Sequence, residues 1–420
     1  MNFSLLVTYC TFCTFKDIKF GLRRSLIMAR NRSNYARRLG EIQPFRVMKL
    51  LARANELARG GGDVIHMEVG EPDFPTPAPI IEAGHQALLE GRTRYTPASG
   101  IPELREAVSG YYRSHYNLEI SPDRIFITAG ASGALLLTSA LLINHGEGLL
   151  MTDPGYPCNR HFLKAFHGEG QLIPVTPATN YQLTADLASR HWQTNTRGVL
   201  LASPANPTGA VLDELTLTAL YELVHSKRGY VVVDEIYHGL TYHRQGGARN
   251  ASVLEVGQQA FVINSFSKYF GMTGWRLGWL VAPDDAVEEL EKLAQNLFIC
   301  PSAIAQYAAL SAFRSDSLEI MEQQRAVFAE RRDFLVPGLK KLGFSIPVSP
   351  EGAFYVYAGL PPGHSDSERF CNDLLEQHLV AITPGTDFGF YRADEHVRFT
   401  YAEEVARLAE ALDRIEKALA

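Results

Sequence analysis

The chain has 420 residues but only five cysteines, which are scattered and odd in number. A disulfide framework needs an even and closely spaced set, so we expect a reducing, cytoplasmic location. Cys10 and Cys13 form a C-x-x-C, but no second pair or following histidine pair completes a zinc site. The thirteen histidines include no H-E-x-x-H or other tight cluster, so we expect no metal.

Long apolar runs and basic stripes are also missing. No run approaches the roughly 20 residues that cross a bilayer, so we expect no membrane partner. The net charge is −6, and beyond the first forty residues acids and bases alternate, which argues against nucleic acid. Residues 1–28 place an apolar stretch before arginines, the reverse of a secretory signal. We expect this segment to be an extension that is either not native or disordered.

What is present from about residue 63 is an alternation of short apolar runs and helical patterns. This alternation indicates an α/β fold with a largely parallel sheet. The expected strands are 124–128, 148–152, 171–175, 198–202, 230–233 and 261–264, with a helix at 215–226. A chain of this length exceeds one compact core, so we expect 71–312 to form a large domain and a second domain to follow.

The pattern changes after about residue 314, where a smaller α+β domain is expected over 313–420. Its expected elements are a helix at 317–342 interrupted by Pro337, strands at 352–357, 380–383 and 397–400, and helices at 367–378 and from 403. Residues 29–70 show no strand alternation of their own, and we expect them to join this smaller domain.

Polar residues with chemical potential follow the ends of the expected strands. Lys268 comes directly after an apolar strand, among serines and aromatics, where poor solvation would lower its pKa. Ser265, Ser267 and Arg276 offer hydroxyls and a forked guanidinium that suit a phosphate dianion. The turn at 130–133 adds backbone N–H groups at a helix N-terminus, a ready anion site. Lys268 alone would be an ordinary loop lysine, but this set favours a phosphorylated cofactor.

A second group could hold an aromatic ring. Asp234 follows three valines, and a buried acid needs a cation such as a protonated pyridine nitrogen. Tyr237 and Asn206 could hydrogen-bond a ring oxygen, and Tyr156 could stack on the ring. Three of them have an ordinary alternative: a helix cap or a structural salt bridge for Asp234, a turn for Asn206 and a core aromatic for Tyr156.

The segments SPANPTG (203–209), DEIY (234–237), SFSK (265–268) and GMTGWRLGW (271–279) occur in this order. Together they resemble the fold type I, pyridoxal-phosphate-dependent aminotransferases of class I/II, the aspartate aminotransferase superfamily. GEPDFPTP (70–77), RYTPASGIPELREAV (94–108), PEGAFYVY (350–357), PGTDFG (384–389) and VRFTYA (397–402) extend the resemblance over roughly 36–420. It implies an α/β large domain with a mainly parallel seven-stranded sheet flanked by helices, plus a smaller α+β domain.

The resemblance also implies roles and the cofactor pyridoxal 5'-phosphate. The implied Schiff-base lysine and general acid/base is Lys268, and Asp234 is the partner of the pyridine nitrogen. The implied ring contacts are Asn206, Tyr237 and Tyr156; the phosphate contacts are Ala131, Ser132, Ser265, Ser267 and Arg276; the substrate contacts are Gly70, Asn206 and Arg398. Tyr95 resembles a tyrosine lent to the neighbouring subunit's phosphate site, which implies a homodimer with shared active sites.

The implied reaction is a ping-pong exchange of an amino group between an L-amino acid and a 2-oxo acid, with glutamate/2-oxoglutarate as one pair. A carbon–sulfur β-lyase, another fold type I enzyme or a cofactor-binding regulator stays open as an alternative. The Ser265-x-x-Lys268 pair lacks the S-D-N and K-T-G companions of penicillin-recognising enzymes. The glycine turn likewise lacks the G-x-G-x-x-G of a dehydrogenase.

The substrate side chain is less constrained by the sequence. A dicarboxylic substrate needs a second cation, yet no arginine or lysine occurs between Lys292 and Arg314. Arg37, Arg92 and Arg94 are the remaining candidates for that role. Apolar or aromatic substrates are therefore as plausible as aspartate, and we expect broad specificity.

Overall fold

The computed structural model describes residues 35–242 and 250–420, so the extension 1–28 with its Cys10–Cys13 pair lies outside the described residues. Residues 44–420 form one compact unit, and residues 1–43 form a separate one. The expected division at residues 312/313 stays a prediction. None of the described helices has the length and apolarity needed to cross a bilayer.

A seven-stranded sheet, in the order β2-β8-β7-β6-β5-β3-β4, is the central layer of the unit 44–420. Only β8 runs antiparallel to its two neighbours. The strands are β2 (Ile125–Thr128), β3 (Gly148–Asp153), β4 (Glu169–Pro174), β5 (Thr196–Ala202), β6 (Tyr230–Asp234), β7 (Phe261–Ser265) and β8 (Gly278–Val281). The mainly parallel sheet is confirmed, and six of its strands match the predicted ones. The short strand β8 was not predicted, because it follows the GMTGWR turn within a single motif.

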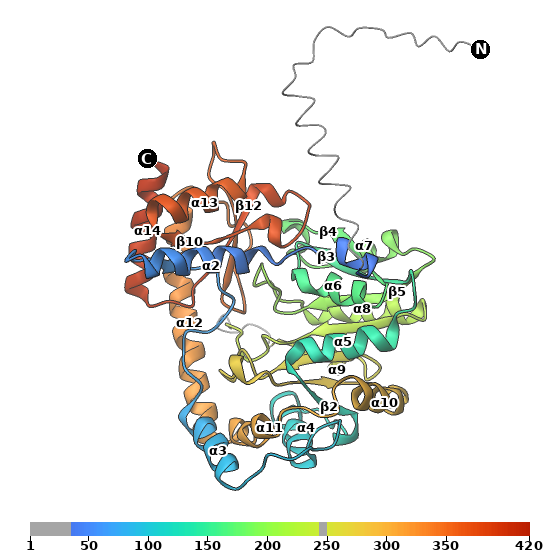
Figure 1. Cartoon of the computed structure of the whole chain (residues 1–420). Helices are drawn as coiled ribbons and strands as arrows, with labels where there is room; N and C mark the ends of the chain where they lie inside the picture. Colours follow the sequence, from blue (N-terminus) through green and yellow to red (C-terminus); the bar gives the residue numbers. More distant parts are fainter. Residues whose placement is uncertain (1–34, 243–249) are drawn as a thin grey trace, which may run out of the picture. The chain divides into compact units, whose positions relative to one another are not determined.

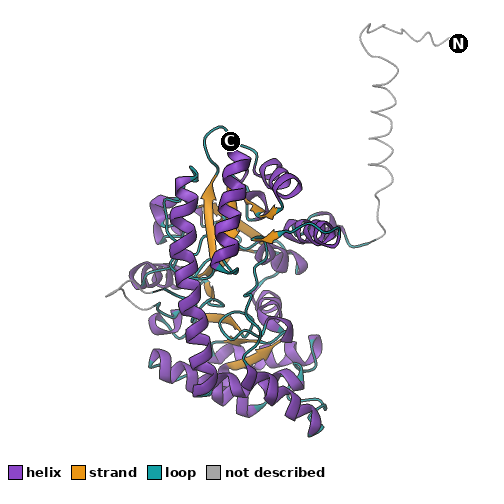
Figure 2. Ribbon diagram, turned by 90° about the vertical axis from the view of Figure 1, so that its left-hand side faces the viewer, coloured by secondary structure: helices purple, strands orange, loops and turns teal. Residues whose placement is uncertain are grey.

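Helices cover both faces of this sheet, and Figure 2 shows its strands lying between helices. On one face lie α5 (Gly130–Leu142), α6 (Pro157–Ala165) and α10 (Val287–Leu297). The other face carries α4 (Pro102–Tyr116), α7 (Ala185–His191), α8 (Glu214–Ser226), α9 (Val253–Val256) and α11 (Ala303–Leu310), with α3 (Ala78–Leu89) against α11. Val232 packs into the first layer, whereas Val231 and Val233 pack into the second. Strands buried on both faces explain the continuous apolar runs of the sequence.

The C-terminal part contains a second, antiparallel sheet, β11-β12-β9, formed by β11 (Thr383–Pro384), β12 (His396–Thr400) and β9 (Tyr355–Gly359). Its helices are α12 (Ser315–Lys341), α13 (Ser367–His378) and α14 (Val405–Leu419). Figure 1 shows the long helix α12 running from these elements to the region of α3 and α11. The helix α2 (Arg46–Arg59) and the short strand β1 (Ile65–His66) precede the large sheet, and β1 pairs in parallel with β10 (Val380–Ala381).

Two local predictions were wrong. Pro337 lies inside α12 without interrupting it, since Leu335, Val336 and Leu339 are buried around it. That packing outweighs the roughly 3 kcal/mol by which an interior proline disfavours a helix. The single strand expected at 380–383 is two strands, β10 and β11, that pair with different partners. The two-residue strand β1 in the segment 29–70 is too short to show alternation, and the expected joining of this segment to the smaller domain stays a prediction.

Candidate active site

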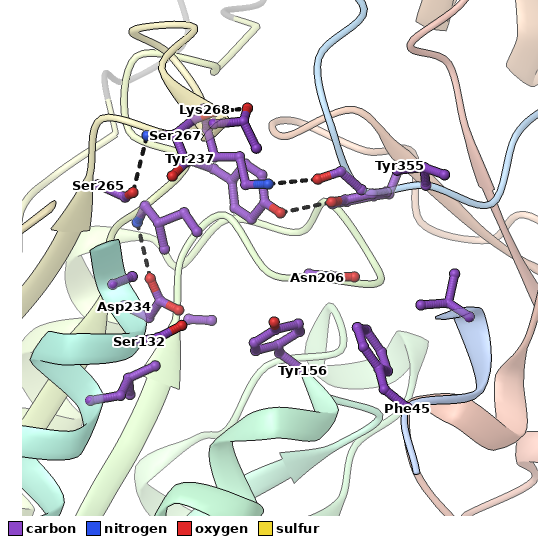
Figure 3. Close-up of a pocket in the computed structure, with 18 of the residues that line it drawn as sticks. Phe45, Ser132, Tyr156, Asn206, Asp234, Tyr237, Ser265, Ser267, Lys268 and Tyr355 are labelled. Atoms are coloured by element: carbon purple, nitrogen blue, oxygen red, sulfur yellow. Dashed lines mark hydrogen bonds between the residues drawn. The ribbon is translucent and has the colours of Figure 1, made fainter. Parts of the chain in front are cut away.

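A cavity of about 220 Å³ lies beyond the carboxyl ends of β5, β6 and β7. Parallel sheets place ligands at this edge, because the turns that follow the strands meet there. Asp234 ends β6, Ser265 ends β7, and Lys268 follows three residues later. The cavity is lined by every site residue expected from the sequence except Tyr95: Gly70, Ala131, Ser132, Tyr156, Asn206, Asp234, Tyr237, Ser265, Ser267, Lys268, Arg276 and Arg398. Figure 3 shows how most of these side chains converge.

Lys268 lies at one side of this cavity. Its Nζ donates a hydrogen bond of 2.5 Å to the backbone carbonyl of Gly70 (Figure 3). Burial lowers the pKa of Lys268 to about 8, and the nearby carboxylate of Glu71 opposes that shift. A neutral amine is therefore accessible close to neutral pH, which a lysine needs to attack a carbonyl or accept a proton.

Asp234 faces the same cavity with only 6% of its surface exposed. Its Oδ1 accepts a hydrogen bond of 3.1 Å from the backbone N–H of Ile236, and no side-chain cation among the described residues forms an ion pair with it. Burial raises the pKa of Asp234 to about 7. A buried carboxylate of this kind is stabilised by a cation that enters the cavity, and a protonated pyridine nitrogen fits that requirement.

Gly130, Arg276 and Ser267 form a cup for an anion. Gly130 has a φ of +67°, and a Cβ there would come within 2.7 Å of Arg276 Nη2. Glycine therefore permits both the turn and the close approach of the guanidinium. Arg276 Nη1 donates to Ser267 Oγ at 3.4 Å. The first turn of α5, with Ala131 and Ser132, supplies backbone N–H groups that have no acceptor within the helix.

The hydroxyl of Ser265 forms hydrogen bonds with the protein backbone. Its hydroxyl donates to the carbonyl of Leu277 at 3.2 Å and accepts from the N–H of Ser267 at 3.0 Å. Both contacts hold the turn between β7 and Lys268 in place. Ser265 lines the cavity, but its own proton is already used within the protein.

Arg398 on β12 is 2% exposed and points into the cavity from the smaller sheet. Its Nη1 donates to Asn206 Oδ1 at 3.0 Å, and its Nη2 donates to the backbone carbonyl of Glu68. Its Nε is buried and has no hydrogen-bond partner. A carboxylate is the natural acceptor for such a guanidinium. The Asn206 amide nitrogen stays available for a second ligand group.

The remaining ring contacts lie opposite one another. Tyr237 is 5% exposed, and its hydroxyl is 2.8 Å from the hydroxyl of Tyr355. Tyr156 lines the cavity beside Phe45, whose ring meets it edge-on at 6.2 Å. The cavity can therefore enclose a flat ring that carries an oxygen, a basic nitrogen and a phosphate.

Two features of this cavity were not predicted from the sequence. Tyr355 stands inside the quoted segment PEGAFYVY, yet no role was assigned to it. The second feature is an apolar wall from the start of α2, formed by Phe45, Val47, Met48 and Leu51. These residues carry no polar group, so no chemical pattern marks them.

Two of the cations expected for a distal carboxylate do not line the cavity of their own chain. Arg92 pairs with Glu90 at 3.3 Å and stacks over Tyr307 at 5.3 Å. Neither Arg92 nor Arg94 lines the cavity, and Arg37 belongs to the separate unit 1–43. Lys268, Arg276 and Arg398 are the only basic residues that line the cavity within the described part of the chain.

Known proteins are similar to this chain over most of its length. Residues 62–415 match the family model of aminotransferase class I and II. The chain is 38% identical to a valine–pyruvate aminotransferase of Mycobacterium tuberculosis, with 89% of this chain and 96% of that protein covered. It is 35% identical to an aspartate aminotransferase of Thermotoga maritima, over 91% and 98% of the two chains.

Solved structures show the same fold. The aspartate aminotransferase of Thermus thermophilus with maleate superposes with a TM-score of 0.86 at 32% identity, covering 92% of this chain and 99% of that one. Family model, sequence identity and fold coincide over nearly the whole of the unit 44–420. The chain therefore belongs to the class I and II aminotransferases of the aspartate aminotransferase fold, and it is a transaminase.

Proposed function

We propose that the cavity binds pyridoxal 5'-phosphate and exchanges amino groups between L-amino acids and 2-oxo acids in a ping-pong cycle. When bound, this cofactor supplies an aldehyde for amines and an electron sink for the bonds of the substrate Cα. The residues present fit it. Asp234 would face the ring nitrogen, Tyr237 and Asn206 the ring oxygen, and Arg276 with its cup the phosphate.

The protein's own residues then account for substrate binding and proton movement. Arg398 would bind the substrate α-carboxylate, with Asn206 and the backbone of Gly70 beside it. Lys268 would remove the proton from the substrate Cα and deliver a proton to the carbon that was the aldehyde carbon of the cofactor. The lowered pKa of Lys268 suits both directions of this transfer.

One observation carries this proposal: Lys268 with a lowered pKa, Asp234 buried without a cation and Arg398 with a free Nε all line one cavity. The test supplies amino acids together with 2-oxo acids and follows amino-group exchange. Release of pyruvate and ammonia from cysteine-type substrates, without exchange, would favour the β-lyase alternative. Cofactor binding without either reaction would favour a regulator.

We also propose that one substrate pair is apolar and that glutamate/2-oxoglutarate is the other. The wall of Phe45, Val47, Met48 and Leu51 offers apolar contacts and no cation to a substrate side chain. Met48 is nevertheless 56% exposed, so a distal carboxylate could reach solvent there and remain hydrated. Of the relatives, one is named for valine and pyruvate and others for aspartate. These names support amino-acid substrates with an apolar or an acidic side chain.

Met48→Arg is expected to change this specificity. For valine- or leucine-type substrates, kcat/KM should fall about tenfold, because an apolar contact is lost. For glutamate and 2-oxoglutarate it should rise, because the new guanidinium can pair with the distal carboxylate. Steady-state kinetics over a substrate panel measures both changes, and Met48→Leu is the matched control. A strict preference for aspartate in the wild-type enzyme would contradict the apolar assignment.

We further propose a homodimer in which Tyr95 completes the partner's site. Tyr95 is 83% exposed and does not line the cavity of its own chain. Tyr95→Phe is expected to weaken cofactor binding about tenfold, since it removes one hydrogen bond to a charged group.

Mixing subunits tests the sharing of Tyr95 directly. A dimer of one Tyr95→Phe and one Lys268→Ala subunit would contain one intact site, built from Lys268 of the first and Tyr95 of the second. At a cofactor concentration near the wild-type Kd, where Tyr95→Phe sites are mostly empty, random reassociation of equal amounts should therefore restore about a quarter of the wild-type activity measured under the same conditions. No recovery above the sum of the two separate variants would show that Tyr95 does not serve the partner's site.

A further inference from the structure

Tyr355 lies at the start of β9 and is only 1% exposed. It lines the cavity between residues that follow β6 and residues on β12. Its backbone is paired with Thr400 of β12, two residues beyond Arg398. Its side chain contacts the hydroxyl of Tyr237 after β6 (Figure 3). It also contacts the guanidinium of Arg398 on β12.

The first contact is the hydrogen bond of 2.8 Å between the hydroxyls of Tyr355 and Tyr237. A pair of hydroxyls shares one proton and leaves the other free. When Tyr355 donates, the Tyr237 proton is free to point at a ring oxygen in the cavity. Hydrogen bonds in such a chain strengthen one another, so a donating Tyr355 makes Tyr237 the stronger donor.

The second contact is between the ring of Tyr355 and Arg398. The guanidinium carbon lies 4.4 Å from the centre of this ring and 4.7 Å from that of Phe388. Aromatic rings at this distance attract and orient a guanidinium. A Cβ on Gly70 would stand 2.5 Å from the Tyr355 hydroxyl, so glycine at position 70 makes room for Tyr355.

We propose that Tyr355 is a positioning residue with two separable functions, an inference that rests on the proposed cofactor and reaction. Its hydroxyl orients Tyr237 toward the cofactor's ring oxygen. Its ring holds Arg398 in the orientation that receives the substrate carboxylate. One side chain thereby aligns cofactor and substrate within the same cavity.

Tyr355→Phe isolates the first function because it keeps the ring and removes the hydroxyl. The readout is the pH midpoint of the visible absorption change of the protein loaded with pyridoxal phosphate. A weaker Tyr237 donor stabilises the anionic ring oxygen less, so the midpoint should rise, by about half a pH unit. Arg398, Tyr156 and Lys268, the other charged or titratable groups next to the tyrosine pair, are unchanged in this variant. The KM values should stay within about twofold of wild type.

Tyr355→Leu removes the ring as well and tests the second function. The KM values for the amino acid and the 2-oxo acid should both rise about tenfold, because both substrates use the Arg398 site. Tyr357→Leu is the matched control for this variant, as Tyr357→Phe is for Tyr355→Phe. Tyr357 lies on the same strand and face and is equally buried, but it stacks on His396 at 4.8 Å, outside the cavity.

The outcomes separate this inference from the proposed function. A wild-type protein without a visible band in pyridoxal phosphate would overturn the cofactor proposal and the role of Tyr355 with it. A wild-type protein with a band, but with the same pH midpoint in Tyr355→Phe, would overturn the hydroxyl's role alone. A shifted midpoint in Tyr357→Phe would also overturn it, since the effect would not be specific to the tyrosine pair.

Discussion

Lys268→Ala is expected to abolish amino-group exchange, with kcat lowered by about 10⁴-fold or more. The substitution removes the only lysine that lines the cavity within the described residues, and no other side chain there can donate an amine. The wild-type protein with pyridoxal phosphate should show a visible absorption band. Borohydride should remove this band and attach the cofactor permanently to the chain. The variant should show neither the band nor covalent labelling.

A pH series sharpens this prediction. The amine must be unprotonated to react, and burial places the pKa of Lys268 at about 8. The rate at which the cofactor-free protein captures pyridoxal phosphate should therefore rise as the pH increases to about 8 and level off above it. Lys292→Ala is the control, because that lysine is exposed and paired with Glu289 outside the cavity. Substantial exchange activity in Lys268→Ala would refute the central assignment.

Asp234→Asn is expected to lower kcat by roughly 10²–10⁴-fold, the range expected for loss of one partner of a buried ion pair. An amide cannot hold a ring nitrogen in its protonated form, so the electron sink is weakened. KM should change much less, because Asp234 contacts no substrate group in the proposed arrangement. Stopped-flow absorption and steady-state kinetics measure the two effects separately.

The same substitution should stabilise the cofactor-free protein at high pH. Burial raises the pKa of Asp234 from an ordinary 3.8 to about 7, so the folded state favours the protonated acid. Unpaired Asp234 therefore destabilises the fold increasingly as the pH rises from about 4 to 7, and fully above 7. Denaturant unfolding at pH 8 should show the asparagine variant as the more stable protein, with the difference vanishing near pH 4.

Glu235→Gln is the matched control for the loss of kcat. Glu235 is the next residue, is 1% exposed and also has a pKa raised by burial, to about 8. It points away from the cavity, toward Ser252 and the N–H of Val253. Its substitution should change kcat little. Equal losses of kcat in both variants would mean that the Asp234 effect is structural.

The amino-acid sequence alone determined the central sheet and the residues at its edge. Strands such as the three valines before Asp234 are buried on both faces, so they stand out in the sequence as continuous apolar runs. Asp234 and Ser265 end β6 and β7, and Lys268 comes three residues after β7, which places all three at one edge of a parallel sheet. The motif resemblance then supplied Arg398 and Gly70, which no local pattern marks.

Only the tertiary structure decided which distant residues touch. Asn206 and Arg398 are 192 positions apart, and Tyr237 and Tyr355 are 118 apart, yet each pair shares a hydrogen bond. The apolar wall of α2 and the continuity of α12 through Pro337 also depend on packing against other elements. Helix and strand periods report neighbours within one element, whereas contacts between elements follow from how their buried faces fit together.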